Sequence, residues 1–133
     1  MNALHPMYDR ESLIILGDHV TLEAGTGCVH TAPGHGHEDF DICHEYDTKK
    51  NTNIGLILPV DGRGRMNELS GKYEGLTTDE ANIAIVKDLK EDGALFAEQD
   101  IIHQYAHCWR CKTPILYRAT DQWFCSVDSF KDE

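Results

Sequence analysis

The apolar residues of this chain come in short runs separated by glycine-containing turns. The longest runs, residues 13–16 and 54–60, have the length of strands, far below the roughly 18 residues that span a bilayer. Further strands are predicted at residues 20–22, 28–31, 94–97, 101–105, 115–117 and 122–127. We therefore expect a fold rich in β-structure, without a membrane-spanning segment.

Two helices interrupt this pattern. The first is expected to begin near His37, with two acidic residues in its first turn, where they favour the helix dipole. The second carries a capping box, with Thr77 as N-cap and Glu80 three residues later, and Gly93 is expected to end it. Residues 61–75 contain four glycines and are predicted to be a loop. The predicted class is a β-rich mixed α/β domain with two helices.

Length and charge limit the classes of function. The chain has 133 residues, the size of one domain. Its net charge of −11, from 12 basic and 23 acidic side chains, disfavours a broad phosphate-binding face, because nucleic-acid affinity comes mainly from clustered Lys and Arg. The N-terminus has no basic segment followed by an apolar one, so we expect no signal peptide and a cytoplasmic location.

Five cysteines without an export signal argue against a disulfide framework. Cys28, Cys43 and Cys125 stand alone and are predicted to be small buried hydrophobic residues. Cys108 and Cys111 form a Cys-x-x-Cys pair, which is half of a tetrahedral zinc site. His103 or His107 could supply further ligands, so a non-catalytic zinc-knuckle interaction module is one hypothesis for function.

Residues 25–39 hold the densest group of chemically capable side chains. Three histidines, His30, His35 and His37, stand with Glu38 and Asp39 on a glycine-rich stretch that leads into the first helix. Loops between rigid elements are where binding groups are usually placed, and a carboxylate there can pair with an ammonium group. We interpret the segment as a pocket for a small polar ligand. The alternative is that the histidines are surface residues and Asp39 only a helix-dipole partner.

The same residues fit a second chemistry. His35, His37 and Asp39 alternate as in the His-x-His-x-Asp core that metallo-β-lactamase-type hydrolases use for zinc. Those hydrolases have another histidine next, and here the position is Phe40. A zinc-dependent small-molecule hydrolase is therefore a competing hypothesis.

Two longer motifs resemble one known family. The segment Gly-Thr-Gly-Cys-Val-His-Thr-Ala-Pro-Gly-His-Gly at residues 25–36 is similar to the editing-pocket segment of isoleucyl-tRNA synthetases. The segment His-Cys-Trp-Arg-Cys-Lys-Thr-Pro at residues 107–114, with Tyr-Arg-Ala-Thr-Asp-Gln-Trp-Phe at 117–124, resembles the stretch where that family's chain returns to its catalytic domain. The resemblance divides the chain into residues 1–106, an editing-domain portion with its pocket loop at 25–39, and residues 107–133, the Cys-x-x-Cys turn and return strands.

The resemblance implies a fold and an activity. The fold is part of the β-barrel editing domain of the valyl-, isoleucyl- and leucyl-tRNA synthetases, with about two flanking helices. The activity is hydrolysis of tRNA(Ile) mischarged with valine, because one methylene gives only about 1–3 kcal/mol of discrimination and a second site must destroy the wrong product. By resemblance Asp39 holds the substrate ammonium, and His30 lies beside the acyl side chain. The pocket lining then comprises Gly27, Thr31, Ala32, Pro33, Gly34 and His35.

Parts of that family's machinery are expected to lie outside this chain. They are the threonine-rich wall of the editing pocket, the ATP-site signatures and the partner Cys-x-x-Cys of the zinc site. We therefore expect a fragment with half an active site and half a metal site, Cys108 and Cys111. Editing needs no cofactor, structural zinc belongs to the parent protein, and only the absent catalytic domain uses ATP. The expected partners are the 3′ end of tRNA(Ile) and the rest of the synthetase, with self-association of the fragment possible and no membrane involved.

Overall fold

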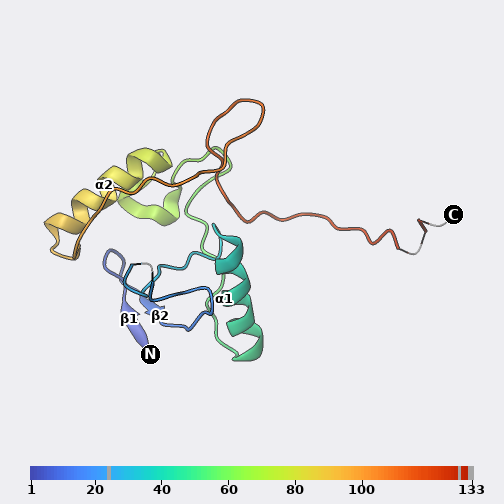
Figure 1. The fold of residues 1–133 in the computed structure, drawn as a ribbon, viewed down its shortest axis with the longest axis horizontal. Coiled ribbons are helices and arrows are strands. Elements are labelled where there is room, and N and C mark those ends of the chain that lie inside the picture. The colour runs from blue at the N-terminus through green and yellow to red at the C-terminus, as the bar shows by residue number, and fades with distance from the viewer. Residues whose placement is uncertain (24, 129, 132–133) are drawn as a thin grey trace.

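The computed structural model describes residues 1–23, 25–128 and 130–131. Residues 129, 132 and 133 of the predicted return segment therefore lie outside the described residues. The described part is small and mixed α/β, which confirms the predicted class at that level. The elements in chain order are β1 (Asn2–Leu4), β2 (Glu11–Leu13), α1 (His37–Lys49), the 3-10 helix η1 (Glu68–Tyr73) and α2 (Thr78–Glu91), as Figure 1 shows.

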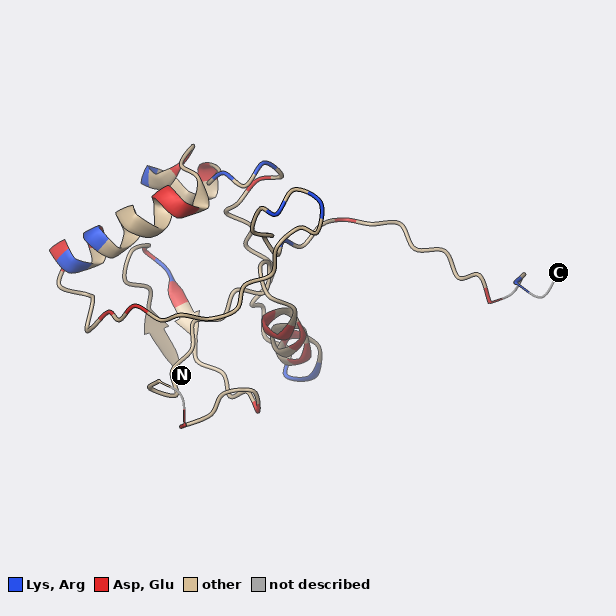
Figure 2. Ribbon diagram, turned by 45° about the horizontal axis from the view of Figure 1, so that its top comes forward, with Lys and Arg blue, Asp and Glu red and all other residues tan. Residues whose placement is uncertain are grey.

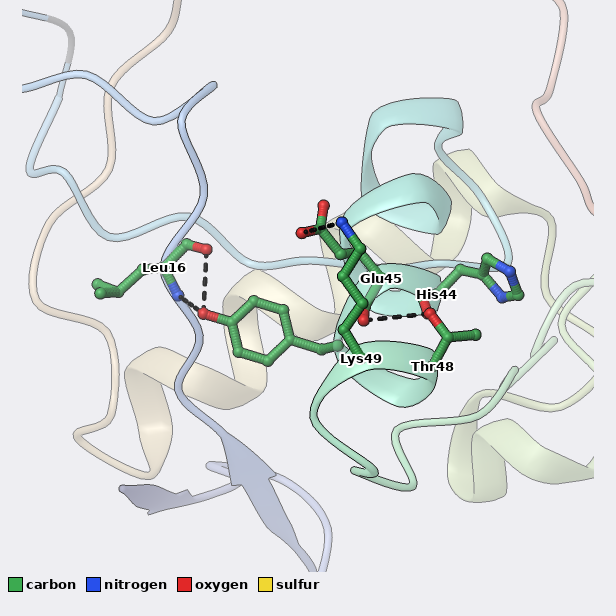
Figure 3. Close-up of polar contacts among 6 residues, drawn as sticks. Leu16, His44, Glu45, Thr48 and Lys49 are labelled. Atoms are coloured by element: carbon green, nitrogen blue, oxygen red, sulfur yellow. Dashed lines mark hydrogen bonds and ion pairs between the residues drawn. The ribbon is translucent and has the colours of Figure 1, made fainter.

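The sheet is a single antiparallel hairpin. β1 pairs with β2 in a register that sets Ala3 opposite Ser12. The strand predicted at residues 13–16 coincides with β2 only at Leu13. Just beyond it, the backbone of Leu16 is bonded to the helix instead: its N–H donates to the Tyr46 hydroxyl at 2.9 Å, and its carbonyl accepts from that hydroxyl at 3.2 Å (Figure 3).

The other predicted strands are not formed in the described residues. Residues 20–22, 28–31, 54–60, 94–97, 101–105, 115–117 and 122–127 contribute at most isolated bridges, such as Val60 to Met66. From residue 94 to residue 127 the chain runs as an extended trace with one hairpin loop (Figure 1). A strand is stable only where a neighbour pairs with it and buries one face. The expectation of a β-rich fold is thus wrong for the described residues.

Both predicted helices form. α1 begins at His37, as expected, after the N-cap residue Gly36, which has no side chain to cap it. α2 has the predicted capping box: the Thr77 hydroxyl accepts from the Glu80 N–H, and the Glu80 carboxylate accepts from the Thr77 N–H at 2.8 Å. Gly93 follows with a φ of 69°, the left-handed conformation that suits a helix end.

The loop predicted at residues 61–75 contains the unexpected helix η1. The Asn67 side chain caps it by accepting from the Leu69 N–H at 3.0 Å. Tyr73 at its end is 3% exposed, and its hydroxyl donates to Asp88 on α2 at 2.6 Å. The small core of the molecule lies at this junction of η1 and α2, where Ser70 and Ala81 are also buried.

Most large apolar side chains lie outside that core. The accessible surface is 11462 Å², whereas a compact monomer of this mass exposes about 7,000 Å². Cys43 is buried as predicted, but Cys28 and Cys125 are exposed. None of the helices in the described residues is long and apolar enough to cross a membrane.

Candidate functional site

The pocket loop, residues 25–39, connects the β-hairpin region to α1 and folds back in a turn at its centre. The His35 N–H donates to the Ala32 carbonyl at 2.9 Å. Gly34 is buried inside this turn, and a Cβ there would lie 2.5 Å from Leu58 Cδ2 and 2.8 Å from the Ile57 carbonyl oxygen. Only glycine allows the loop to approach the segment at residues 57–58 so closely.

Asp39 connects the first turn of α1 to the loop. Its Oδ2 accepts from the Ala32 N–H at 3.0 Å, and the same oxygen lies 2.8 Å from the position of a Cβ on Gly36. The carboxylate is partly buried and is therefore aimed at the loop instead of at solvent. Two predicted site residues, Asp39 and Ala32, are in direct contact.

His30, near the start of the loop, is exposed. It is close enough to His5 to help lower the pKa of His5, behind the larger effects of partial burial and of Arg10. His30 borders a cavity of about 820 Å³ that is lined mainly by apolar side chains of residues 13–22, 27–33 and 53–59. The predicted site residues that share this lining are Gly27, His30, Thr31, Ala32, Pro33 and His35.

His35 is held by a segment that the sequence analysis did not assign to the site. Its Nδ1 lies 2.9 Å from the Tyr117 carbonyl oxygen, and its Nε2 is covered without a hydrogen-bond partner in the described residues. The Ala119 N–H donates to the Gly34 carbonyl at 2.8 Å. These contacts enclose a second groove, of about 620 Å³, between the loop and residues 117–121. Neither segment has a local sequence signal that predicts these contacts, because the partners are about 80 positions apart in the chain.

The three residues of the zinc-hydrolase hypothesis point to different partners. His35 faces Tyr117, Asp39 faces Ala32, and His37 faces Asp41 on the surface, with 3.8 Å between Nδ1 and Oδ2. Nowhere among residues 1–23, 25–128 and 130–131 do three His, Cys, Asp or Glu side chains gather as a metal site would require. The geometry does not favour the zinc-dependent hydrolase.

Cys108 and Cys111 lie on a hairpin turn closed by the Cys108 N–H donating to the Thr113 carbonyl at 2.8 Å. The Cys111 thiol lies 2.9 Å from the Thr113 hydroxyl. Hydrogen bonds from Thr113, and then from Cys108, lower the pKa of Cys111 to about 7. The Nδ1 atoms of His103 and His107 bond to the nearby carbonyl oxygens of Gln104 and Tyr105. In the described residues neither histidine joins the two thiols in a group of three potential metal ligands.

Sequence comparison identifies the family. The chain is 56% identical over all of its residues to the isoleucine–tRNA ligase of Thermoanaerobacter sp. strain X514. It is 54% identical over 129 residues, 97% of the chain, to that of Caldicellulosiruptor bescii, and 53% identical over 129 residues to that of Moorella thermoacetica. No family model matches the sequence. The chain belongs to the isoleucine–tRNA ligase family.

The chain corresponds to a segment of such a ligase. It spans 14% of the Thermoanaerobacter protein and 13% of the Caldicellulosiruptor protein. The match to the first of these covers the whole chain. Both the pocket loop at residues 25–39 and the Cys-x-x-Cys hairpin are therefore part of the isoleucine–tRNA ligase segment.

Proposed function

We propose that this chain is the C-terminal part of the inserted editing domain of an isoleucine–tRNA ligase. Its reaction is hydrolysis of the ester that joins valine to tRNA(Ile). The observation that carries the proposal is the contact between Asp39 and Ala32, which holds a carboxylate against the pocket loop. Ala32 itself lines the cavity of about 820 Å³. Its partners are then the 3′ end of tRNA(Ile) and the rest of the ligase.

Each site residue takes a role that suits its chemistry. Asp39 pairs with the α-ammonium group of the bound aminoacyl ester, a charge-assisted contact. His30, which is exposed and borders the cavity, lies beside the acyl side chain and helps to exclude isoleucine. Water attacks the ester carbonyl, since no Ser or Cys on this loop has a paired base that would make it a nucleophile. The remaining wall is formed by Gly27, Thr31, Ala32, Pro33, Gly34 and His35.

The rest of the ligase completes both the fold and the site. Exposed apolar side chains such as Leu22, Phe96 and Phe124, each 90–100% exposed, require a partner surface, and the remainder of a β-barrel editing domain supplies one. A threonine-rich wall from another part of the ligase closes the pocket. A second Cys-x-x-Cys completes a structural zinc site with Cys108 and Cys111, and the catalytic domain alone uses ATP.

The test is deacylation of valyl-tRNA(Ile) by a ligase that carries this segment, and by the chain alone. Asp39→Ala removes the proposed ammonium partner. Asp41→Ala is the matched control, because Asp41 lies on the same helix, is 64% exposed and contacts His37. We expect the first variant to lose valyl-ester hydrolysis and the second to retain it, while circular dichroism shows both folded. Equal activity of the two variants would contradict the proposal.

A further inference from the structure

The positive charges of this acidic chain are distributed unevenly. Five lysines have a carboxylate oxygen within 4.0 Å, namely Lys49, Lys72, Lys87, Lys90 and Lys131. The other seven basic side chains form no such ion pair with the described residues. Five of those seven lie on two loops, and we call them the basic strip: Arg63, Arg65, Arg110, Lys112 and Arg118. All five are exposed.

Two contacts hold these loops together. The Arg118 Nε donates to the Val60 carbonyl at 2.8 Å, and a Cβ on Gly64 would lie 3.0 Å from Leu116 Cδ1. Figure 2 shows the blue segments of both loops next to each other, away from the red and blue mixture on α2. The two loops that carry the basic strip are therefore in contact, although members of the strip are up to 55 positions apart in the sequence.

Two acidic residues near the strip, Glu80 and Asp61, are already engaged. Glu80 accepts from Thr77 in the capping box, and after these hydrogen bonds the Arg65 charge also contributes to lowering the pKa of Glu80. Asp61 Oδ1 accepts the backbone N–H groups of Arg63 and Arg65 at 2.8 and 2.9 Å, which lower the pKa of that carboxyl. Asp61 bonds only to the backbone of the two arginines in this turn, so their side chains remain available for other contacts. The Arg65 guanidinium donates through NH1 to the Gly75 carbonyl at 2.8 Å. For Arg63 and Lys112 the side-chain nitrogens have no hydrogen-bond partner among the described residues.

We propose that the basic strip binds the phosphate backbone of RNA near its 3′ end. This rests on the proposed function, which makes the RNA a tRNA. The strip is a local phosphate-binding surface on a chain whose net charge of −11 disfavours a broad one. Arginine guanidinium groups match phosphate geometry with paired donors. Unpaired cations gathered on one face are the electrostatic footprint of a nucleic-acid surface.

An aromatic platform favours RNA over an acidic protein. Trp109 is 76% exposed, and the Arg110 guanidinium lies 4.9 Å from the centre of its ring. Such a pair can stack with an unpaired base, which an acidic peptide does not have. Arg118 also borders the groove of about 620 Å³ that reaches His35 and His37. An RNA strand bound across the basic strip would therefore lead towards the pocket loop.

The test measures binding of an RNA hairpin with a single-stranded 3′ tail and no amino acid, across potassium chloride from about 50 to about 200 mM. Each lost phosphate contact reduces the slope of log Kd against log salt by about 0.7–0.9. Arg63→Gln with Lys112→Gln should therefore reduce the slope by about 1.4–1.8. Lys87→Gln with Lys90→Gln changes the net charge equally, on α2, and should leave the slope as it was.

Three outcomes would overturn the proposal. They are an unchanged slope in the strip variant, an equal change in the α2 variant, or equally effective competition by poly-glutamate, which would indicate an acidic protein partner. Trp109→Ala should weaken binding about fivefold or more without altering the slope, because stacking releases no counterions. The RNA probe carries no ester, so its binding does not depend on hydrolysis. If the salt slopes change as expected but valyl-tRNA(Ile) is not hydrolysed, the proposed function is rejected and RNA binding by the basic strip still stands.

Discussion

The imidazole of His35 donates a hydrogen bond from Nδ1 to the Tyr117 carbonyl oxygen, 2.9 Å away and 82 positions later in the sequence. A carbonyl oxygen only accepts, so this contact selects the tautomer that carries its proton on Nδ1. The neighbouring bond from the Ala119 N–H to the Gly34 carbonyl strengthens the attachment. The pocket loop is therefore attached to residues 117–119.

Removing the His35 contact should loosen the loop. In His35→Ala the amide of Ala119 should exchange its hydrogen about two- to tenfold faster, since one hydrogen bond contributes about 0.5–1.5 kcal/mol. His35→Asn should retain most of the protection, because its side-chain amide can donate from nearly the same place. His37→Ala is the control, with its side chain 84% exposed on the next turn. Amide exchange followed by NMR would contradict this role if the Asn and Ala variants behaved alike.

The capping box makes a second prediction, on stability. Thr77→Ala removes the side-chain oxygen that accepts from the Glu80 N–H, and should lower the free energy of unfolding by about 1 kcal/mol. Thr78→Ala, at the first helical position, leaves the box intact and should change stability much less. Urea denaturation followed by circular dichroism measures both. A Thr78 variant that is destabilised as much as the Thr77 variant would show that the cap is not the cause.

The helices could be predicted because their signals are local. Thr77 and Glu80 are three positions apart, and the cap needs no other part of the chain to form. The start of α1 at His37 follows in the same way from the glycine before it and the acidic residues after it. The place of Asp39 in the first turn of α1, next to the loop that precedes the helix, could be predicted from the same local signals.

The strands could not be predicted, because each depends on a distant partner. Residues 13–16 are apolar enough for a strand, yet the Tyr46 hydroxyl occupies both backbone groups of Leu16. The contact of His35 with Tyr117 likewise has no signature within either segment. Apolar runs indicate that a surface must be covered, and they do not specify what covers it.

Asp88 should make stability depend on pH. The Lys72 ammonium, and then the Tyr73 hydroxyl, lower the pKa of Asp88 below its ordinary value of 3.8. A carboxyl whose pKa is lower in the folded state stabilises above its unfolded value, and that stabilisation is lost as pH falls through the folded value. Asp88→Asn should therefore be less stable than the wild type at neutral pH, with the difference shrinking below about pH 4.

The control for this prediction is Asp100→Asn, whose exposed side chain makes no hydrogen bond to the described residues. Thermal melts at a series of pH values would follow all three proteins. At neutral pH the melting temperature of Asp100→Asn should stay close to that of the wild type, whereas that of Asp88→Asn should be lower. A constant gap between wild type and Asp88→Asn at every pH would mean that packing, not the charge, accounts for the loss.

Cys111 should be the most reactive exposed thiol at neutral pH once any metal has been removed with a chelator. Its pKa is lowered to about 7 by hydrogen bonds from Thr113, and the thiolate is the form that attacks. Alkylation of Cys111 by iodoacetamide, located by peptide mass spectrometry, should thus rise through about pH 7. Thr113→Val removes the hydroxyl that lies 2.9 Å from the Cys111 thiol and should shift this profile to higher pH. If the Cys111 profiles of Thr113→Val and of the unsubstituted chain coincide, Thr113 does not activate Cys111.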